Sequence, residues 1–173
     1  LAERFEILTY EPRGIGRTEQ PEGAWRMADY ADDAVALMDA VGWERANVLG
    51  ESFGGMTALH LAHRHPGRVG RLAVASTTAG GRGGGSVDIA PLLDLTQREA
   101  AAAALKLLDA ENTGLEAYDP ATFEARLSAR IGFETAFAEP SVTSGGYRRL
   151  LEARREHDIW DALPDIAQDT IVI

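Results

Sequence analysis

A serine between two glycines is the residue of this chain best placed to do chemistry. Residues 48–55 read Val-Leu-Gly-Glu-Ser-Phe-Gly-Gly, so Ser52 stands in a Gly-x-Ser-x-Gly pattern. An apolar run at residues 46–49 precedes the pattern, and a helix-like run at residues 56–65 follows it. A strand, a sharp turn and a helix in that order form a nucleophile elbow, which lifts the serine hydroxyl into a cleft. We therefore predict that Ser52 is a nucleophile.

The residues around Ser52 have roles that follow from such a turn. Gly50 and Gly54 should let the strand end and the helix start pass close together, and we expect a β-branched side chain at Gly54 to disrupt folding. The backbone N–H of Phe53 should lie at the helix N-terminus, where it can stabilise an oxyanion. We interpret Glu51 as structural, because the elbow directs neighbouring side chains apart. A flexible Gly/Ser turn is the alternative interpretation of the whole pattern.

The rest of the chain alternates strand signals with helix signals. Apolar spacing and capping residues predict further elements, namely helices over residues 27–41, 100–108, 120–131 and 147–157 and strands over residues 71–76 and 169–173. The glycine-rich residues 80–86 are expected to be a hinge into an all-helical, mobile cap. This predicts three parts: residues 1–79 as a partial core with the elbow, residues 80–163 as the cap, and residues 164–173 as the return to the core.

Three features of the sequence resemble the alpha/beta-hydrolase superfamily. The first is the elbow itself. The second is residues 5–10, which read as a buried strand, followed by residues 11–18, Glu-Pro-Arg-Gly-Ile-Gly-Arg-Thr. These are similar to the family's turn after its fourth strand, with Glu11 and Thr18 in place of the usual Asp and Ser. The third is His-Pro-Gly-Arg-Val at residues 65–69, which is similar to the family's link from the elbow helix to the sixth strand.

The resemblance implies an α/β protein with the alpha/beta-hydrolase fold, a partial and mostly parallel sheet flanked by helices and carrying a helical cap insertion. It also implies a serine hydrolase without cofactor or metal. In such an enzyme Ser52 would attack the carbonyl of a small-molecule ester or lactone, and water would hydrolyse the acyl-enzyme. The glycine-rich hinge and the tail after the cap resemble lactonase- and esterase-like members of the 3-oxoadipate enol-lactonase type.

The family's catalytic order, serine then acid then histidine, implies that the two partners of Ser52 come later in the chain. One family position for the acid follows the sixth strand, where Thr77 and Thr78 stand here. We expect the acid and the histidine beyond residue 173. His157 is the one histidine after the elbow helix; we interpret it as structural, with the role of base as the alternative.

The resemblance to this family also implies that other parts of the family's site lie before Leu1. The family's third strand, which carries the second oxyanion donor, lies between its fourth and fifth strands, here residues 5–10 and 46–49. We expect the chain to be a fragment of a longer hydrolase, marginally stable and inactive by itself. The alternative is a complete small protein that is inactive because it has no triad.

Composition excludes several classes of function. The formal charge of −10 argues against a nucleic-acid or anionic-membrane surface. There is no cysteine, and no apolar run reaches membrane-spanning length. His60 and His63 stand one helical turn apart, yet no further ligand accompanies them, so we predict no metal site. We expect a cytoplasmic protein, and the sequence carries no signal of an oligomeric state.

Other functions share much of this pattern. An aminopeptidase or a haloperoxidase-like enzyme would keep the fold and act on a different bond. A non-catalytic hydrolase-like binding protein would keep the fold and lose the chemistry. A substrate with a carboxylate would need an arginine fork, for which Arg82, Arg154 and Arg155 are the candidates, although solvated surface positions explain them as well.

Overall fold

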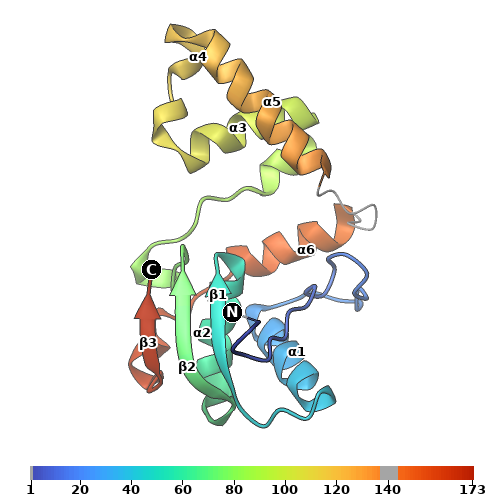
Figure 1. Ribbon diagram of the computed structural model, residues 1–173, viewed down its shortest axis with the longest axis vertical. Coiled ribbons are helices and arrows are strands. Elements are labelled where there is room, and N and C mark those ends of the chain that lie inside the picture. Colours follow the sequence, from blue (N-terminus) through green and yellow to red (C-terminus); the bar gives the residue numbers. More distant parts are fainter. Residues whose placement is uncertain (1, 137–143) are drawn as a thin grey trace.

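A parallel sheet of three strands forms the centre of the protein. The computed structural model describes residues 2–136 and 144–173. Strands β1 (Ala46–Glu51), β2 (Val69–Ala75) and β3 (Asp169–Val172) lie in the order β1-β2-β3. Residues 76–168 connect β2 to β3, and we call this segment the insertion. The carboxyl ends of the strands all point toward its helices (Figure 1). The sequence predicted all three strands, and the parallel pairing follows from the helix that connects β1 to β2.

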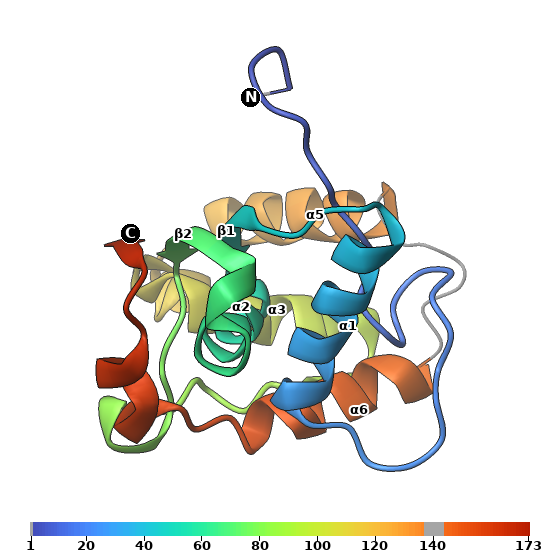
Figure 2. The ribbon, with the colours of Figure 1, turned by 90° about the horizontal axis from the view of Figure 1, so that it is seen from below.

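Helix α2 (Phe53–Arg64) covers one face of β1 and β2, and helix α1 (Met27–Ala40) packs beside α2 on the side of β1 (Figure 2). They bury an apolar cluster with the strands that includes Ala31, Ala62 and Leu72. The helical spacing of apolar residues predicted this burial for α1, and Gly42, with φ of 75°, ends that helix.

The prediction of a buried strand over residues 5–10 is wrong. The segment forms no ladder with β1, and its apolar side chains Phe5 and Ile7 are 58% and 48% exposed. Figure 2 shows the N-terminal segment projecting from the body of the protein. A strand needs a neighbour for its N–H and C=O groups. Within the described ranges no strand lies beside these residues, so a strand-like sequence has nothing to pair with.

The turn after that segment is held against α1. The guanidinium of Arg13 makes two hydrogen bonds of 2.6 Å to the carboxylate of Asp33 on α1. Gly14 packs so closely on Trp25 that an added Cβ would lie 2.6 Å from the indole ring. The sequence predicted turn chemistry here, and these contacts show what the arginine and glycine of the turn do.

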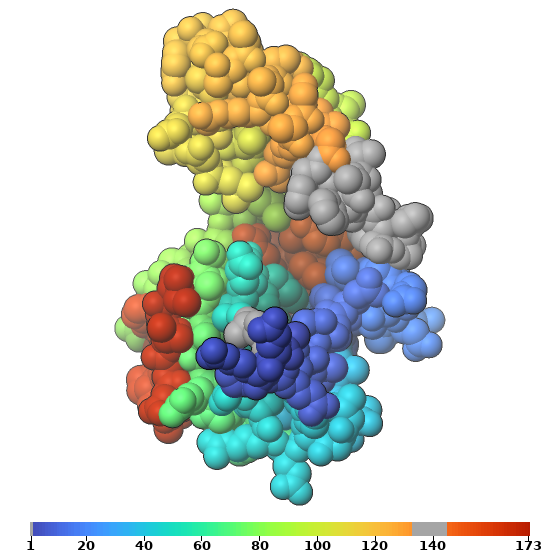
Figure 3. Space-filling view, in the orientation of Figure 1, coloured from blue at the N-terminus to red at the C-terminus, as the bar shows by residue number. Residues whose placement is uncertain are grey.

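Most of the insertion forms a separate group of helices. Helices α3 (Gln97–Leu108), α4 (Leu115–Tyr118) and α5 (Pro120–Ala136) stand beyond the carboxyl ends of the strands, and a narrow waist separates them from the body (Figures 1 and 3). They share their own apolar cluster of Ala101, Leu115, Phe123 and Leu127. The capping box of Thr96 and Glu99 opens α3 as predicted. We call α3, α4 and α5 the outer helices.

The last helix of the insertion packs with the core. Helix α6 (Ser144–Arg155) buries Leu150 and Leu151 in a cluster that also holds Trp25, Tyr30 and Met56. The backbone of α6 touches the turn described above, because an added Cβ at Gly146 would lie 2.3 Å from the carbonyl oxygen of Gly14. The sequence grouped α6 with the cap. The division of the chain at residues 79 and 163 stays a prediction, while the packing places α6 against α1 and α2.

The two ends of the insertion meet at the edge of the core. Gly80 and Asp158 form an antiparallel bridge, and the Ile159 N–H donates a hydrogen bond of 2.9 Å to the Ala79 carbonyl. Short helical turns, Ala90–Asp94 and Trp160–Asp165, flank this crossing. Across the described parts of the chain, no helix is both long and apolar enough to cross a membrane.

Candidate active site

Ser52 lies in the geometry that the elbow prediction requires. It follows β1 directly, precedes α2, and has φ of 51° and ψ of −117°. Such a positive φ is strained for a residue with a side chain, and the strain is typical of functional turns. The Ser52 N–H donates a hydrogen bond of 3.0 Å to the Ala75 carbonyl, so the turn is tied to β2. The residue is exposed at the carboxyl end of the sheet, where parallel α/β proteins bind ligands.

The close approach at the elbow depends on Gly50 and Gly55. A Cβ added at Gly50 would lie 2.3 Å from the carbonyl oxygen of Gly54, which is backbone and cannot move aside cheaply. A Cβ at Gly55 would lie 2.7 Å from the Cβ of Thr77. A Cβ at Gly54 meets no atom within 4 Å among the described residues. The steric prediction was therefore right for Gly50 and wrong for Gly54. Gly54 takes part in the close crossing through its own carbonyl group, which lies where a side chain at Gly50 would stand.

Phe53 supplies a backbone donor beside Ser52. It is the first residue of α2, and the first N–H groups of a helix have no partner within the helix. In residues 2–136 and 144–173, no group accepts a hydrogen bond from this N–H. The Phe53 ring packs edge-on against Tyr30 with 4.8 Å between ring centroids, which anchors the start of the helix. The N–H is thus available to a negatively charged oxygen at the positive end of the helix dipole.

The remaining predicted residue, Glu51, ends β1. It pairs in register with Ala75 of β2, and its side chain is exposed. The structural interpretation of Glu51 stays a prediction. Thr77 is a partner of the elbow that no sequence pattern indicated: its hydroxyl donates a hydrogen bond of 2.8 Å to the Ser52 carbonyl.

His157 is engaged away from Ser52. Its Nε2 lies 2.9 Å from the Thr78 carbonyl and its Nδ1 lies 3.1 Å from Nε2 of His60. A carbonyl only accepts, so Nε2 of His157 donates, Nδ1 accepts, and His60 donates to it. His157 is 7% exposed, and burial lowers its pKa. Nδ1 of His157 thus ties the end of the insertion to α2, and Nε2 ties it to the start of the insertion. With both ring nitrogens engaged, the structural interpretation of His157 is supported over the role of base.

The histidine pair does not extend to a metal site. The described part of the chain contains no group of three or more side chains that could hold a metal ion together. Burial, and then the nearby charges of His157, Arg64 and His63, lowers the pKa of His60 to about 4. His60 is therefore neutral at pH 7 and serves as a hydrogen-bond donor.

We predict that the protein loses stability as the pH falls from 7 to 5. The pKa of His60 is about 6.5 in an unfolded chain and about 4 in the folded one, and that of His157 is also lowered. Between these values the unfolded state binds more protons, so the stability present above pH 6.5 declines toward pH 4. Each proton that only the unfolded state binds lowers the free energy of unfolding by at most about 1.4 kcal/mol per pH unit. The effect is smaller for His60 because its side chain is partly exposed.

Urea unfolding at pH 7 and pH 5 measures this loss. The control is His60→Gln, whose amide can still donate to His157 but does not titrate. The variant should show a smaller difference between the two pH values than the unmodified protein. An equal difference in both proteins would show that the titration of His60 does not contribute to the pH dependence.

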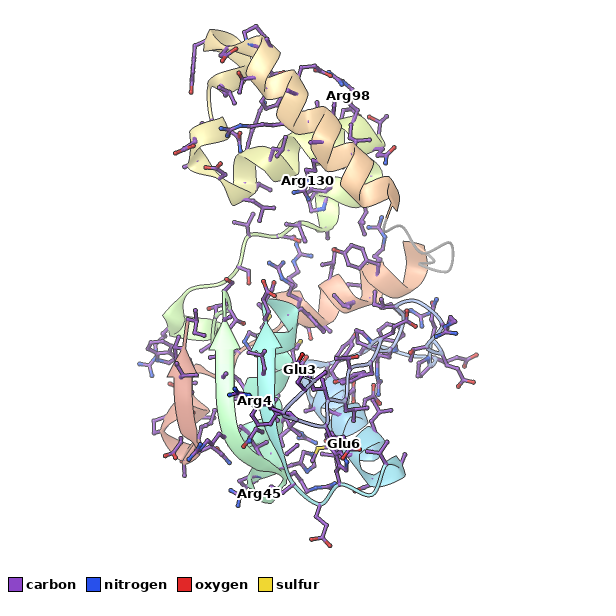
Figure 4. The ribbon with its side chains drawn as sticks, viewed as in Figure 1. Glu3, Arg4, Glu6, Arg45, Arg98 and Arg130 are labelled. Carbon is purple, nitrogen blue, oxygen red and sulfur yellow. The ribbon has the colours of Figure 1, made fainter. Side chains whose placement is uncertain are left out.

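The three candidate arginines for a carboxylate fork already contact oxygens of this chain. Arg82 pairs with Asp161, Arg154 donates to the Val87 carbonyl at 2.9 Å, and Arg155 pairs with Asp88 at 3.3 Å. Figure 4 shows other charged residues at either end of the protein, with Arg45 at the amino ends of the strands and Arg98 and Arg130 on the outer helices. The candidates thus hold the hinge in place, which agrees with surface structural roles.

Comparison with known proteins places this site in a family. A family model described as "alpha/beta hydrolase fold" matches residues 1–170. The chain belongs to this family. Its solved relatives include the enol-lactonase from Burkholderia xenovorans LB400, which is 27% identical, covers 93% of this chain and 58% of the lactonase, and superposes with a TM-score of 0.67.

Two curated hydrolases show the same relationship at the level of sequence. The 2-hydroxymuconate semialdehyde hydrolase of Pseudomonas putida is 34% identical in an alignment that covers 96% of this chain and 58% of that protein. The 3-oxoadipate enol-lactonase 2 of Acinetobacter baylyi is 32% identical over 77 residues, which are 44% of this chain and 29% of the lactonase. This hydrolase-family chain therefore spans less than two thirds of either relative.

The acid and the histidine that the sequence predicts as partners of Ser52 do not lie beside it in the described part of the chain. The residues after β2 are Ser76, Thr77 and Thr78, not an acid. No described acidic or histidine side chain makes a hydrogen bond to the Ser52 hydroxyl. The structure thus contains the elbow, its helix and one backbone donor.

Proposed function

We propose that the protein is a serine hydrolase that cleaves a carboxylic ester or a lactone through an acyl-enzyme on Ser52. The observation that carries the proposal is the backbone at Ser52, which is held at φ of 51° at the carboxyl end of β1, with the Phe53 N–H beside it. A serine in such a position is exposed to a ligand. The strained backbone of Ser52 is the conformation that a nucleophile elbow requires.

The chemistry requires a general base, because a serine hydroxyl is a weak nucleophile until its proton is removed. The Ser52 oxygen then attacks the carbonyl carbon, and the charge that develops on the carbonyl oxygen is stabilised by the Phe53 N–H and a second donor. The alcohol leaves with a proton from the base, and water attacks the acyl-enzyme by the same route in reverse. His157 is committed to His60 and Thr78, so the proposal assigns the base and its acid to residues that follow β3, in the family's order.

The relatives support this class of substrate. Two of them are named as lactonases that open an enol-lactone, at 27% and 32% identity. A second candidate substrate is a semialdehyde of the kind named for the Pseudomonas putida relative, because that match extends over 96% of the chain. A lactone is an internal ester, so the ester and lactone activities need the same groups at Ser52.

A fluorophosphonate probe tests the proposal on the full-length protein. We expect covalent labelling that is slowed by a small ester or lactone that competes for the site. Slowing by 2-hydroxymuconate semialdehyde alone would favour the second candidate. A folded full-length protein that does not react with the probe would contradict the proposal and favour the non-catalytic binding protein.

A further inference from the structure

Two strained serines lie side by side at the carboxyl ends of β1 and β2. Ser52 has φ of 51° and Ser76 has φ of 47°, and no other described residue with a side chain has a positive φ. The parallel register pairs Glu51 with Ala75, so the two serines occupy equivalent positions after adjacent strands. The elbow accounts for the strain at Ser52 but not for the strain at Ser76.

The turn at Ser76 brings the next residue, Thr77, against the elbow. The Thr77 hydroxyl donates a hydrogen bond of 2.8 Å to the carbonyl oxygen of Ser52. Its Cβ and methyl lie against Gly55, where an added Cβ would come within 2.7 Å of both atoms. A strand that continued straight past Ala75 would not turn back toward α2. The left-handed backbone at Ser76 thus has a structural consequence, which is the placement of Thr77.

The carbonyl that Thr77 holds belongs to the peptide group that carries the Phe53 N–H. A peptide group is planar and trans, so fixing the direction of its C=O also fixes the direction of its N–H. The Ser52 carbonyl also accepts hydrogen bonds from the N–H groups of Gly55 at 3.0 Å and Met56 at 3.2 Å. These two donors come from α2 itself, whereas Thr77 ties the peptide group to the sheet. A hydrogen bond to a carbonyl also polarises its peptide group, which strengthens the N–H as a donor.

We propose that Thr77 is a positioning residue for the oxyanion donor of the site. Its hydroxyl orients and polarises the Ser52–Phe53 peptide group, so that the Phe53 N–H points to the place where negative charge develops on the substrate. Thr77 does not touch the substrate and acts only through this peptide group. The inference rests on the proposed function, because it assigns a role within the acylation of Ser52.

The test compares two pairs of variants in the full-length protein. Thr77→Val keeps the branched shape against Gly55 and removes the hydroxyl, so it is compared with the unmodified protein. Thr77→Ala and Thr77→Ser differ from each other by the hydroxyl alone. Ester turnover, labelling by the fluorophosphonate and urea unfolding are measured for each. If Thr77→Val does not fold, the Ala and Ser variants still isolate the hydroxyl.

We expect loss of the hydroxyl to lower kcat about tenfold in both pairs, with KM within about twofold. Complete loss of one oxyanion donor lowers kcat by about 10²–10³, and a misdirected donor should cost less. Thr77→Ser should keep most of the turnover even though it loses the packing of the methyl group. A residue that only fills space would give the opposite result, in which Val retains kcat and Ser does not.

The outcome for Ser52→Ala in the same assay separates this inference from the proposed function. If Ser52→Ala retains turnover, the proposed function fails. The other outcome is that Ser52→Ala abolishes turnover while Thr77→Val keeps the kcat of the unmodified protein and Thr77→Ala keeps the kcat of Thr77→Ser. The proposed function then stands and the role of Thr77 is refuted.

Discussion

Replacing Ser52 by alanine is expected to lower the ester turnover of the full-length protein by about 10⁶-fold, as removal of a nucleophilic serine does in known triads. The reason is that no other group can form the acyl-enzyme. Folding should be unchanged, because the side chain is exposed and alanine adopts the same backbone conformation at a similar cost. Initial rates with an activated ester and a urea unfolding curve measure the two expectations.

Ser76 offers a matched control for this substitution. It is also an exposed serine with a left-handed backbone, and it follows the neighbouring strand. Ser76→Ala should therefore keep its turnover and its stability close to those of the unmodified protein. If Ser52→Ala keeps normal turnover in a preparation free of other esterases, Ser52 is not the nucleophile.

Replacing Gly50 by alanine is expected to destabilise the fold by roughly 4 kcal/mol or more, at the upper end of single substitutions. The added Cβ would lie 2.3 Å from the Gly54 carbonyl oxygen, 2.6 Å from its carbon and 2.7 Å from the Gly55 nitrogen. All three are backbone atoms, so the strand and the helix would have to separate. A domain is stable by only about 5–15 kcal/mol, and the elbow should therefore be lost along with much of the folded population.

Gly54→Ala is the control for Gly50→Ala at the same turn. An added Cβ at Gly54 meets nothing within 4 Å among the described residues, and alanine favours the helix by about 1 kcal/mol over glycine. The variant should keep or slightly gain stability in urea unfolding and should still react with the serine probe. Equal losses of stability in the two variants would mean that the crossing of strand and helix is not as the structure has it.

The parts of the fold that could be predicted from the sequence are those with local signals. Apolar spacing located α1, and the capping box of Thr96 and Glu99 located the start of α3. The Gly-x-Ser-x-Gly pattern stands between a strand signal and a helix signal, so Ser52 and the helix after it were predicted together. Each of these signals depends on residues a few positions apart.

Most of the errors concern contacts between residues far apart in the chain. Residues 5–10 have the composition of a strand, but pairing depends on a neighbour that composition does not supply. The apolar residues of α6 predicted a helix and could not tell that it packs with Trp25 and Tyr30. Which of Gly50 and Gly54 has no room for a side chain depends on which of the two Cβ positions would face the backbone of the opposite element, and the sequence does not show that direction. The hydrogen bond from Thr77 to the Ser52 carbonyl spans two strands and has no signature in the sequence.

The claim that Ser52 carries the acyl group is tested most directly by peptide mass spectrometry. The full-length protein is mixed briefly with an activated ester, quenched in acid and digested with trypsin. Cleavage after Arg45 and Arg64 releases residues 46–64, in which Ser52 is the only serine. The account predicts that the acyl mass appears on this peptide, that fragmentation places it on Ser52, and that Ser52→Ala abolishes it. An acyl group that forms at the rate of turnover on any other peptide, or on residues 46–64 at a position other than Ser52, would contradict it.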